Sequence, residues 1–414
     1  MLNWCSRFNI CCFLDNHHYH IAHHNIECVV AAGAVSSVTA HAGNAFQSLN
    51  EFQRKNKDWL FGHLAYDLKN ETEALTSNNA DRIGFPDLFF FVPQFIIELK
   101  EDAVSIGSLN DDHEETWRQI SSTAITAGRP PQKIAIHNRY TKEEYEATVE
   151  KLRRHILRGD CYEINFCQEF FAEDAEIDPL WLHLRLSASS PNPFSAFYKV
   201  NDRYLSCMSP ERYLRKEGNR LLSQPIKGTA KRYPDNPERD NEQLQQLLQS
   251  NKERAENIMI VDLVRNDLSR VCREGTVKVD ELCAVYSFPQ VFQMISSVTG
   301  VLRPDAEWTD AIRSTFPMGS MTGAPKKKVM ELIEKYEVTK RGLFSGSIGY
   351  ITPGNDFDFN VVIRSALYNA QDKYLSFQAG SAITFNSDPS KEYEECLLKG
   401  EAIKKALAET NTFH

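Results

Sequence analysis

Strand-like and helix-like segments follow one another irregularly over most of this chain, and this order is the strongest constraint on its fold. Strands are predicted at 162–167, 194–200, 203–207, 212–215, 346–351, 359–369 and 374–379. Helices are predicted at 141–156, at 239–269 with an interruption, at 325–336 and at 389–408. Because no regular strand–helix–strand rhythm is present, the pattern favours a mainly antiparallel α/β sandwich over a doubly wound sheet.

One boundary divides the chain. The polar run from Asn110 to Gln132 ends in Gly128-Arg129-Pro130-Pro131, which is typical of a connection between folded parts. We therefore distinguish an N-terminal region, residues 1–130, from a main region, residues 131–414, and expect the N-terminal region to be packed into the same fold.

Charge and hydropathy exclude two classes of partner. The 414 residues carry a net charge of −9, and the basic residues are scattered, so a nucleic-acid partner is not expected. The longest apolar runs fall far short of the ~20 residues that a membrane span needs. The N-terminus also lacks the pattern of a secretory signal, so we expect a cytoplasmic protein with no membrane association.

The cysteines and the histidines suggest no structural metal site or disulfide framework. Ten cysteines are spread irregularly through the chain, which fits reduced thiols. The histidine-rich tract at 17–24 has neither the spacing nor the thiolates of a structural zinc site. We interpret this tract as an ordinary, partly exposed segment.

Two Glu-x-x-Glu pairs are the best evidence for a bound cation. Glu253 with Glu256, and Glu392 with Glu395, each place two carboxylates one turn apart on a predicted helix. If the pairs face each other, they could hold Mg²⁺, which takes few protein carboxylates and keeps water or ligand oxygens for its remaining positions. Solvated helix charge is the alternative interpretation of the same spacing. Lys399 lies seven residues beyond Glu392, on the same stripe of the helix.

A glycine-containing loop precedes the helix that is predicted to start near Pro325. In Gly319-Ser-Met-Thr-Gly-Ala-Pro-Lys326, free backbone N–H groups at the helix entry could bind an anion. The spacing of a nucleotide-binding phosphate loop is absent, so a carboxylate is the better candidate. A plain helix-entry turn remains the alternative.

Lys227 and Glu211 are candidates for catalytic chemistry. Lys227 stands between a proline and a glycine in Pro225-Ile-Lys-Gly228, and partial burial would lower its pKa and make it a nucleophile or a base. A surface lysine in a turn would look the same. Glu211 could donate a proton if it is buried, or it could simply pair with Arg212.

Taken together, these segments resemble the chorismate-binding enzymes, the family of anthranilate synthase, aminodeoxychorismate synthase, isochorismate synthase and salicylate synthase. The resemblance runs from about residue 135 to residue 408. It is carried by Ser-Pro-Glu-Arg at 209, Pro-Ile-Lys-Gly-Thr at 225, Arg-Ala-Glu-Asn at 254, Val-Asp-Leu-Val-Arg-Asn-Asp-Leu at 261, Gly-Ser-Met-Thr-Gly-Ala-Pro-Lys at 319, Ser-Gly-Ser-Ile-Gly-Tyr at 345, Ile-Arg at 363 and Ala-Gly-Ser-Ala-Ile at 379.

The resemblance implies a large α/β/β/α sandwich of two facing, mainly antiparallel sheets, with the active site in a cleft at one end. It also implies a Mg²⁺ cofactor that neutralises the ring carboxylate of chorismate. By position, Glu256 and Glu395 would be the Mg²⁺ ligands, with Glu253 and Glu392 in support. The main region, 131–414, would then be the chorismate-binding catalytic domain.

The remaining roles are also implied by matching positions. Glu211 matches the general acid that protonates the departing C4 hydroxyl. The positions that match substrate-binding groups, most of them contacts to the two carboxylates of chorismate, are Arg364, Lys399, the backbone at Gly380 and Ser381, Thr229 and Thr322.

Within the family, Lys227 resembles the lysine of the aminodeoxychorismate synthases. That lysine is thought to attack C2 as the C4 hydroxyl leaves, after which ammonia enters at C4 and expels the lysine. Glu163 stands where water-using members carry a lysine base and ammonia users commonly carry glutamine. Gln293 replaces a usual histidine and Phe344 a frequent tyrosine. The loss of the histidine disfavours elimination of pyruvate, which this branch leaves to a separate lyase.

The resemblance therefore favours conversion of chorismate and ammonia to 4-amino-4-deoxychorismate for p-aminobenzoate and folate synthesis. The chain contains no Gly-x-Cys-x-Gly glutaminase motif, so a separate glutamine amidotransferase is the expected source of ammonia. One alternative is anthranilate synthase component I, which Lys227 and Gln293 disfavour. The other is a catalytically silent chorismate-binding subunit, which the presence of Glu211, Lys227 and the four glutamates disfavours.

Overall fold

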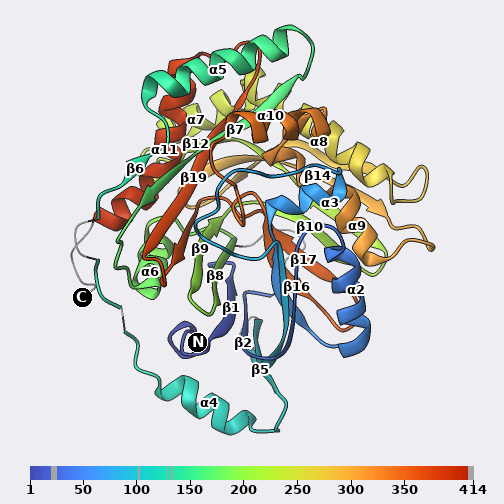
Figure 1. Ribbon diagram of the computed structural model, residues 1–414, viewed down its shortest axis with the longest axis vertical. Helices are drawn as coiled ribbons and strands as arrows, with labels where there is room; N and C mark the ends of the chain where they lie inside the picture. Colours follow the sequence, from blue (N-terminus) through green and yellow to red (C-terminus); the bar gives the residue numbers. More distant parts are fainter. Residues whose placement is uncertain (20–25, 101–102, 127, 132–133, 409–414) are drawn as a thin grey trace.

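The computed structural model describes residues 1–19, 26–100, 103–126, 128–131 and 134–408. Its strands form one continuous antiparallel ladder that folds back on itself (Figure 1). Most of the histidine-rich tract falls in a gap, so its interpretation lies outside the described part of the chain. Of the polar run at 110–132 only residues 127 and 132 are left out, and His113–Ser122 within it form helix α4. None of the helices in the described ranges is long and apolar enough to cross a membrane.

The first half of the ladder is built mainly from the main region. Its strands, in spatial order, are β7 (Glu163–Ala172), β19 (Tyr374–Ile383), β18 (Ser365–Asn369), β9 (Arg203–Ser209), β8 (Phe194–Val200) and β1 (Ile10–Asp15). Two short strands, β6 (His137–Asn138) and β15 (Gly323–Ala324), pair with the free edge of β7.

The second half continues the order through strands from both parts of the sequence. They are β3 (Leu60–Leu64), β16 (Ser347–Ile351), β17 (Phe357–Asn360), β10 (Arg212–Glu217), β11 (Arg220–Gln224), β14 (Val291–Val301) and β13 (Lys278–Ser287). β12 (Ile226–Lys231) follows β11 along the same edge of β14.

A two-stranded ribbon from the N-terminal region joins the halves. β2 (Cys28–Ala40) and β4 (Leu88–Lys100) pair along their whole length; β2 carries β1 on its outer edge, and β4 carries β3 and β5 (Ala103–Ser108). The register shifts between Ala34 and Ser36, next to Gly33 with its φ of 71°. A bulge of this kind bends the strand and increases its twist, which suits a ribbon shared by two facing halves.

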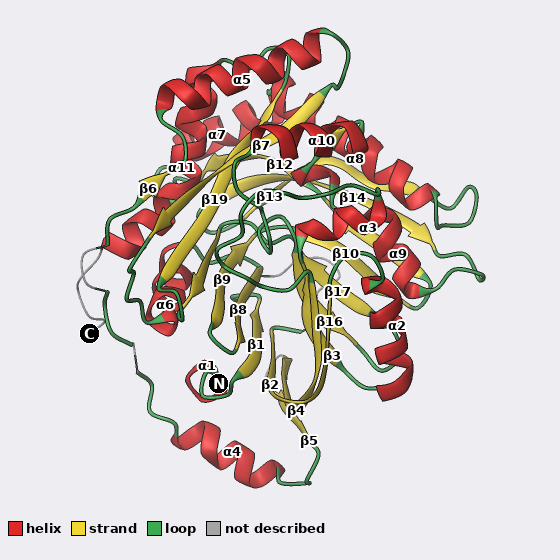
Figure 2. Ribbon diagram, in the orientation of Figure 1, coloured by secondary structure: helices red, strands yellow, loops and turns green. Residues whose placement is uncertain are grey.

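Helices cover the outer faces of the folded sheet (Figure 2). α5 (Lys142–Leu157), α6 (Pro179–Ser189) and α11 (Pro389–Ala408) pack over the first half, and α7 (Pro237–Gln249) and α8 (Asn251–Ser269) pack over β12, β13 and β14. The other helices are α1 (Leu2–Cys5), α2 (Ala45–Asn56), η1 (Tyr66–Leu68), α3 (Lys69–Thr72), α4 (His113–Ser122), α9 (Trp308–Thr315), η2 (Gly319–Met321) and α10 (Lys326–Tyr336).

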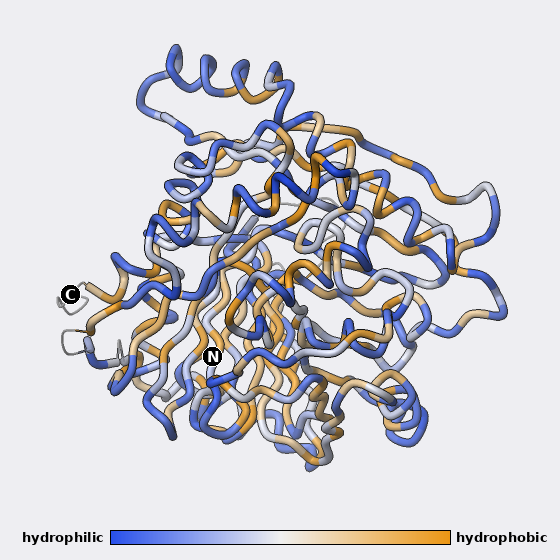
Figure 3. The backbone as a smooth tube through the Cα atoms, turned by 45° about the horizontal axis from the view of Figure 1, so that its top comes forward, coloured by the Kyte–Doolittle hydropathy of each residue, from blue (hydrophilic) through white to orange (hydrophobic). Residues whose placement is uncertain are grey.

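The core lies between the halves and beneath the helices. One apolar cluster contains Cys12 and Ala196 of the first half together with Phe61, Ile348 and Phe359 of the second. Hydrophobic segments follow the strands in the middle of the molecule, whereas the outermost helix turns are hydrophilic (Figure 3). These layers confirm the predicted α/β sandwich, with the two facing sheets joined into one ladder.

Local signals located several elements correctly. Thr141 and Glu144 form the predicted capping box of α5, and the expected interruption falls at Ser250, whose hydroxyl caps α8. The single strand predicted at 359–369 is wrong, because the chain leaves the second half at Asn360 and enters the first at Ser365. The alternation of apolar and polar residues along the chain cannot show that the chain passes from one half of the sheet to the other.

All ten cysteines are buried free thiols, as the irregular spacing predicts. Burial raises the pKa of several of them, including Cys167, whose pKa rises to about 12. These side chains act as small core residues.

A buried ion pair connects three segments of the main region. Arg341 Nη2 lies 2.6 Å from Glu337 Oε1, and both side chains are almost fully buried. The guanidinium also donates to the carbonyls of Met321 (2.6 Å) and Asn165 (2.8 Å), and Glu337 Oε1 accepts from the Cys167 N–H at 2.9 Å. This ion pair therefore holds β7 against the loop that contains η2.

We expect Glu337→Gln to destabilise the protein by about 3–5 kcal/mol, because it leaves a buried guanidinium without its counter-charge. Glu401→Gln, in the exposed Lys405–Glu401 pair, is the matched control and should change stability by less than about 1 kcal/mol. Urea unfolding of both variants measures the difference. Similar midpoints would show that the buried pair does not stabilise this junction.

Candidate functional site

Two chain segments cross side by side from one half of the sheet to the other. One joins β9 to β10 and contains Glu211; the other joins β17 to β18 and contains Arg364. Val361 N–H donates to Glu211 O at 3.0 Å, and Met208 N–H donates to Arg364 O at 3.2 Å, so the crossings are bonded together. Arg364 has a φ of 51°, which is uncommon for a residue other than glycine and is held here by the surrounding structure.

Glu211 is the buried acid of the site. Its side chain is 4% exposed, and burial raises its pKa to about 7, although nearby Ser320 and Lys227 favour the charged form. A carboxyl group with this pKa is partly protonated at neutral pH. It can therefore donate a proton, which is the role predicted for it. Arg212 forms its ion pair with Asp358, at 2.9 Å. The alternative, in which Glu211 is simply the partner of Arg212, is therefore not supported.

A β-bulge directs Lys227 into the site. Ile226 pairs with Ile295 and Thr229 with Gln293, so two residues of β12 bulge between these pairs. Gly228 has a φ of 89°, and a Cβ there would lie 3.1 Å from Glu253 Oε2. Glycine thus permits both the bulge and the close packing of β12 on α8.

The Lys227 ammonium is surrounded by carboxylates. Its Nζ lies 3.3 Å from Glu163 Oε1, and both side chains are largely buried. Burial lowers the pKa of Lys227, but Glu163, Glu256 and Glu211 together raise it above its ordinary value. The prediction that the pKa of Lys227 is lowered is therefore wrong. In this state the Lys227 side chain is protonated, and it must lose a proton before its amine can act as a nucleophile.

The predicted cation site lies where α8 and α11 approach each other. Glu256 and Glu392 are buried, and each keeps one oxygen, Glu256 Oε1 and Glu392 Oε2, that has no hydrogen bond to a described residue. Burial raises the pKa of Glu256 to about 7, and the positive charge of nearby Lys227 offsets this only in part. Lys252 Nζ lies 3.9 Å from a carboxylate oxygen of each glutamate.

The other two glutamates flank this pair. Glu253 packs beside Gly228, and Glu395 is partly exposed and lies 2.8 Å from Lys399. Burial raises the pKa of Glu395, but Lys399, Lys252 and Lys227 together lower it below its usual value. Within the described ranges, no three metal-binding side chains are already grouped as a metal site. Two facing carboxylates with unused oxygens nevertheless fit Mg²⁺, which binds few protein ligands and keeps its waters.

The predicted substrate-binding residues of the first half lie on β19 and α11. Lys399 Nζ donates to Gly380 O at 2.8 Å, and the buried Ser381 hydroxyl makes no hydrogen bond to the residues that the structure describes. A Cβ at Gly380 would lie 1.9 Å from Phe166 O, so only glycine allows β19 to approach β7 here.

The two threonines have different surroundings. Thr322 is fully buried, and its hydroxyl donates to Met318 O at 3.2 Å, inside its own loop. Thr229 is exposed, beyond the bulge that carries Lys227. The structure thus gives Thr322 a local bonding partner, and the substrate-binding roles of both residues stay predictions.

Sequence reasoning missed two buried or bridging lysines. Lys326 Nζ lies 2.5 Å from Asp267 Oδ2 and ties the start of α10 to α8. Lys252 bridges the two helices of the cation site. Its position four residues before Glu256 is a signal that could have suggested the contact. Gln293 is also buried, with both amide atoms unbonded among the described residues.

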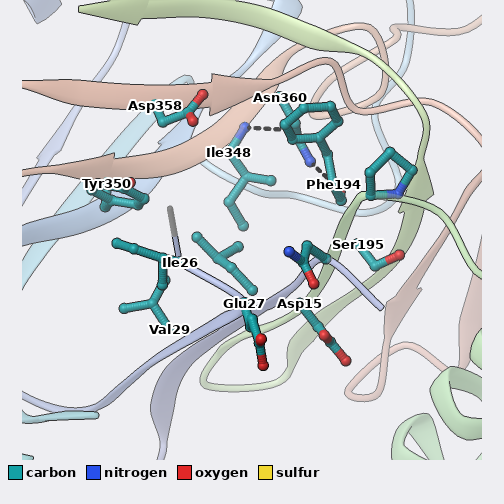
Figure 4. A pocket seen from close by; sticks show the side chains of 13 residues that line it. Asp15, Ile26, Glu27, Val29, Phe194, Ser195, Ile348, Tyr350, Asp358 and Asn360 are labelled. Carbon is teal, nitrogen blue, oxygen red and sulfur yellow. Dashed lines mark hydrogen bonds between the residues drawn. The ribbon is translucent and has the colours of Figure 1, made fainter. Parts of the chain in front are cut away.

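A separate pocket lies between the two halves of the sheet (Figure 4). It is bounded by β1, β2 and β8 on one side and by β16 and β17 on the other. Asn360 crosses it, donating to Phe194 O at 2.9 Å and accepting from Ile348 N–H at 3.1 Å. None of the predicted site residues lines this pocket, so it is separate from the predicted site.

The folded antiparallel sheet and the carboxylate-rich site at one end define the class to which the protein belongs. The chain belongs to the family of chorismate binding enzymes, which it matches from residue 11 to residue 405. It is 36% identical to aminodeoxychorismate synthase component 1 of Salmonella typhimurium, over 84% of this chain and 76% of the relative. It is 33% identical to an anthranilate synthase component I-like protein of Synechocystis, over 89% and 76%.

Solved structures agree on the fold. Anthranilate synthase component I from Streptococcus pneumoniae superposes with a TM-score of 0.82 at 24% identity, covering 94% of this chain and 95% of that one. The menaquinone-specific isochorismate synthase of Escherichia coli gives a TM-score of 0.79 at 16% identity, covering 98% and 91%. At these identities the likeness concerns the fold alone.

The raised pKa of Glu211 predicts a pH dependence of stability. The folded state keeps this carboxyl protonated up to about pH 7, whereas its ordinary pKa is 4.5. Its stabilising contribution is therefore complete below pH 4.5 and is lost as the pH rises to 7, on the order of 3 kcal/mol in all. Glu211→Gln should flatten this loss. Urea unfolding of both proteins in EDTA, between pH 4.5 and 7.5, measures it, and parallel curves would contradict the assignment.

Proposed function

We propose that the protein is component 1 of aminodeoxychorismate synthase, which converts chorismate and ammonia to 4-amino-4-deoxychorismate and water. The observation that carries this proposal is Lys227, an amine directed by a β-bulge into the site, 3.3 Å from Glu163 and beside the buried acid Glu211. A nucleophile and a proton donor next to each other suit a double displacement.

In the proposed reaction, the site first fixes chorismate by its two carboxylates. Mg²⁺ held by Glu256 and Glu395, with Glu253 and Glu392 in support, would neutralise the ring carboxylate. The half-buried guanidinium of Arg364, the Lys399 ammonium and the backbone at Gly380 and Ser381 are the groups available to the substrate's carboxylates. Charge-assisted hydrogen bonds from these groups would fix C2 and C4 relative to Lys227 and Glu211.

Proton transfers then connect the two displacements. Glu163 accepts a proton from Lys227, and the free amine forms a bond to C2 while the ring double bonds shift. The C4–O bond breaks, and Glu211 donates the proton with which the hydroxyl leaves as water. Ammonia next forms a bond at C4 while the double bonds shift back and the C2–N bond breaks, which returns the amine of Lys227. The ammonium formed at C4 gives its extra proton to Glu211, and Lys227 regains the proton held by Glu163. The pKa of Glu211, about 7, suits a group that donates a proton near neutral pH.

We further propose that a separate glutamine amidotransferase supplies the ammonia, and that the enzyme works with Mg²⁺ in the cytoplasm. The name component 1 among the relatives implies a second component. The ten free, buried thiols are consistent with a reducing compartment. Anthranilate synthase component I is the second candidate, favoured by the similarity to the Synechocystis protein named anthranilate synthase component I-like protein.

Product analysis distinguishes the two candidates. We expect the purified chain, given chorismate, Mg²⁺ and ammonium at alkaline pH, to form p-aminobenzoate only when an aminodeoxychorismate lyase is added. The physical reason is that amination at C4 leaves the pyruvyl group in place. Chromatographic detection of anthranilate without lyase would instead establish the second candidate.

Removing the lysine tests the proposed covalent step. Lys227→Ala should lower the rate of C4 amination by at least about a thousandfold, or divert the nitrogen to C2, because the first displacement has no nucleophile. Lys231→Ala, on the exposed end of the same strand, is the matched control and should keep the wild-type rate. An unchanged yield of C4 product from Lys227→Ala would rule out the covalent role.

A further inference from the structure

Lys252 occupies an unusual position at the cation site. It lies in the first turn of α8, and its ammonium is 3.9 Å from Glu256 Oε1 on the same helix and 3.9 Å from Glu392 Oε1 on α11. The two glutamate side chains are 11% and 4% exposed, whereas that of Lys252 is 54% exposed. The lysine thus reaches from solvent to the space between two buried carboxylates.

The charges around Lys252 explain why a cation is needed there. Two buried carboxylates that face each other repel, and burial alone disfavours their charged forms. The other lysines of the site have different contacts, since Lys227 is bound to Glu163 and Lys399 to Glu395. Lys252 is placed differently, since its ammonium lies 3.9 Å from a carboxylate oxygen of both Glu256 and Glu392.

We propose that Lys252 is the resident counter-cation of the metal-free enzyme, holding α8 to α11, and that it swings out to solvent when a divalent cation binds among the four glutamates. This inference rests on the metal site of the proposed function. Mg²⁺ approaches its oxygen ligands to about 2.1 Å and cannot share the same carboxylates with an ammonium without strong repulsion. The flexible stem and the half-exposed position of Lys252 give its charge a route to water.

Displacement of the Lys252 ammonium by a metal ion has a thermodynamic consequence. The bound ammonium competes with the metal, so the metal-free site is stabilised while its affinity for Mg²⁺ is reduced. Lys252 would thereby keep α8 and α11 in place before the metal arrives. Removing the lysine charge should strengthen metal binding and weaken the metal-free fold.

Lysine reactivity tests the movement directly, with Mg²⁺ alone as the probe and the full chain as the protein. A short pulse of acetic anhydride followed by peptide mass spectrometry should label Lys252 slowly in EDTA and several-fold faster in saturating Mg²⁺. Lys55, exposed on α2, is the internal control and should not change. If Mg²⁺ binds, as judged by a rise in melting temperature, and Lys252 labelling stays constant or falls, the displacement is wrong.

Lys252→Met, which keeps the stem without the charge, supplies an independent readout. We expect about tenfold tighter Mg²⁺ binding by calorimetry and a lower melting temperature in EDTA, with Lys55→Met unchanged in both. If wild type binds Mg²⁺ and the variant binds no more tightly, the counter-cation role fails while the metal site stands. If neither protein binds Mg²⁺, both this inference and the metal requirement of the proposed function fail.

Discussion

The buried pair of Arg341 and Glu337 is the contact on which the site depends most. It bonds to the backbone of β7 on one side and to the carbonyl of Met321 on the other. β7 presents Glu163 to Lys227, and the loop that contains η2 brings Ser320 close to Glu211. One ion pair therefore fixes two independent segments, each of which supplies a neighbour to a proposed catalytic group. A buried pair with several additional hydrogen bonds suits this task, because its geometry has few alternatives.

The local sequence predicted what depends on local interactions. Helical spacing and caps located α5, α8 and α11, and the two Glu-x-x-Glu pairs do lie on helices that approach each other. The crossings at 209–211 and 361–364 could not be predicted this way, because they are fixed by pairing between distant strands. For the same reason the predicted strand at 359–369 joined residues that belong to opposite halves of the sheet.

The raised pKa of Lys227 is a second property that the sequence could not supply. Burial in an apolar turn lowers the pKa of a lysine, and the residues beside it, Ile226 and Gly228, gave no reason to expect otherwise. The opposing carboxylates come from β7, α8 and the β9–β10 crossing, which are distant in sequence. Whether the pKa of Lys227 is raised or lowered therefore depends on residues that only the tertiary fold brings together. The contacts of Lys252 are partly local. Glu256 is only four residues away on the same helix, so the sequence could have suggested that contact, whereas the contact to Glu392 on α11 depends on the fold.

Charge balance also constrains the order of events in the proposed reaction. Chorismate brings two carboxylates to a site where Glu163, Glu211 and Glu256 already surround Lys227. Additional negative charge alone would raise the pKa of the lysine further and hold its proton more tightly. Positive charge therefore has to arrive with the substrate. The half-buried Arg364 and, in the proposed reaction, a divalent cation bound by the glutamates would supply it. On this argument the free amine forms only after both anion and cation are bound, which would keep the nucleophile protonated and unreactive in the empty enzyme.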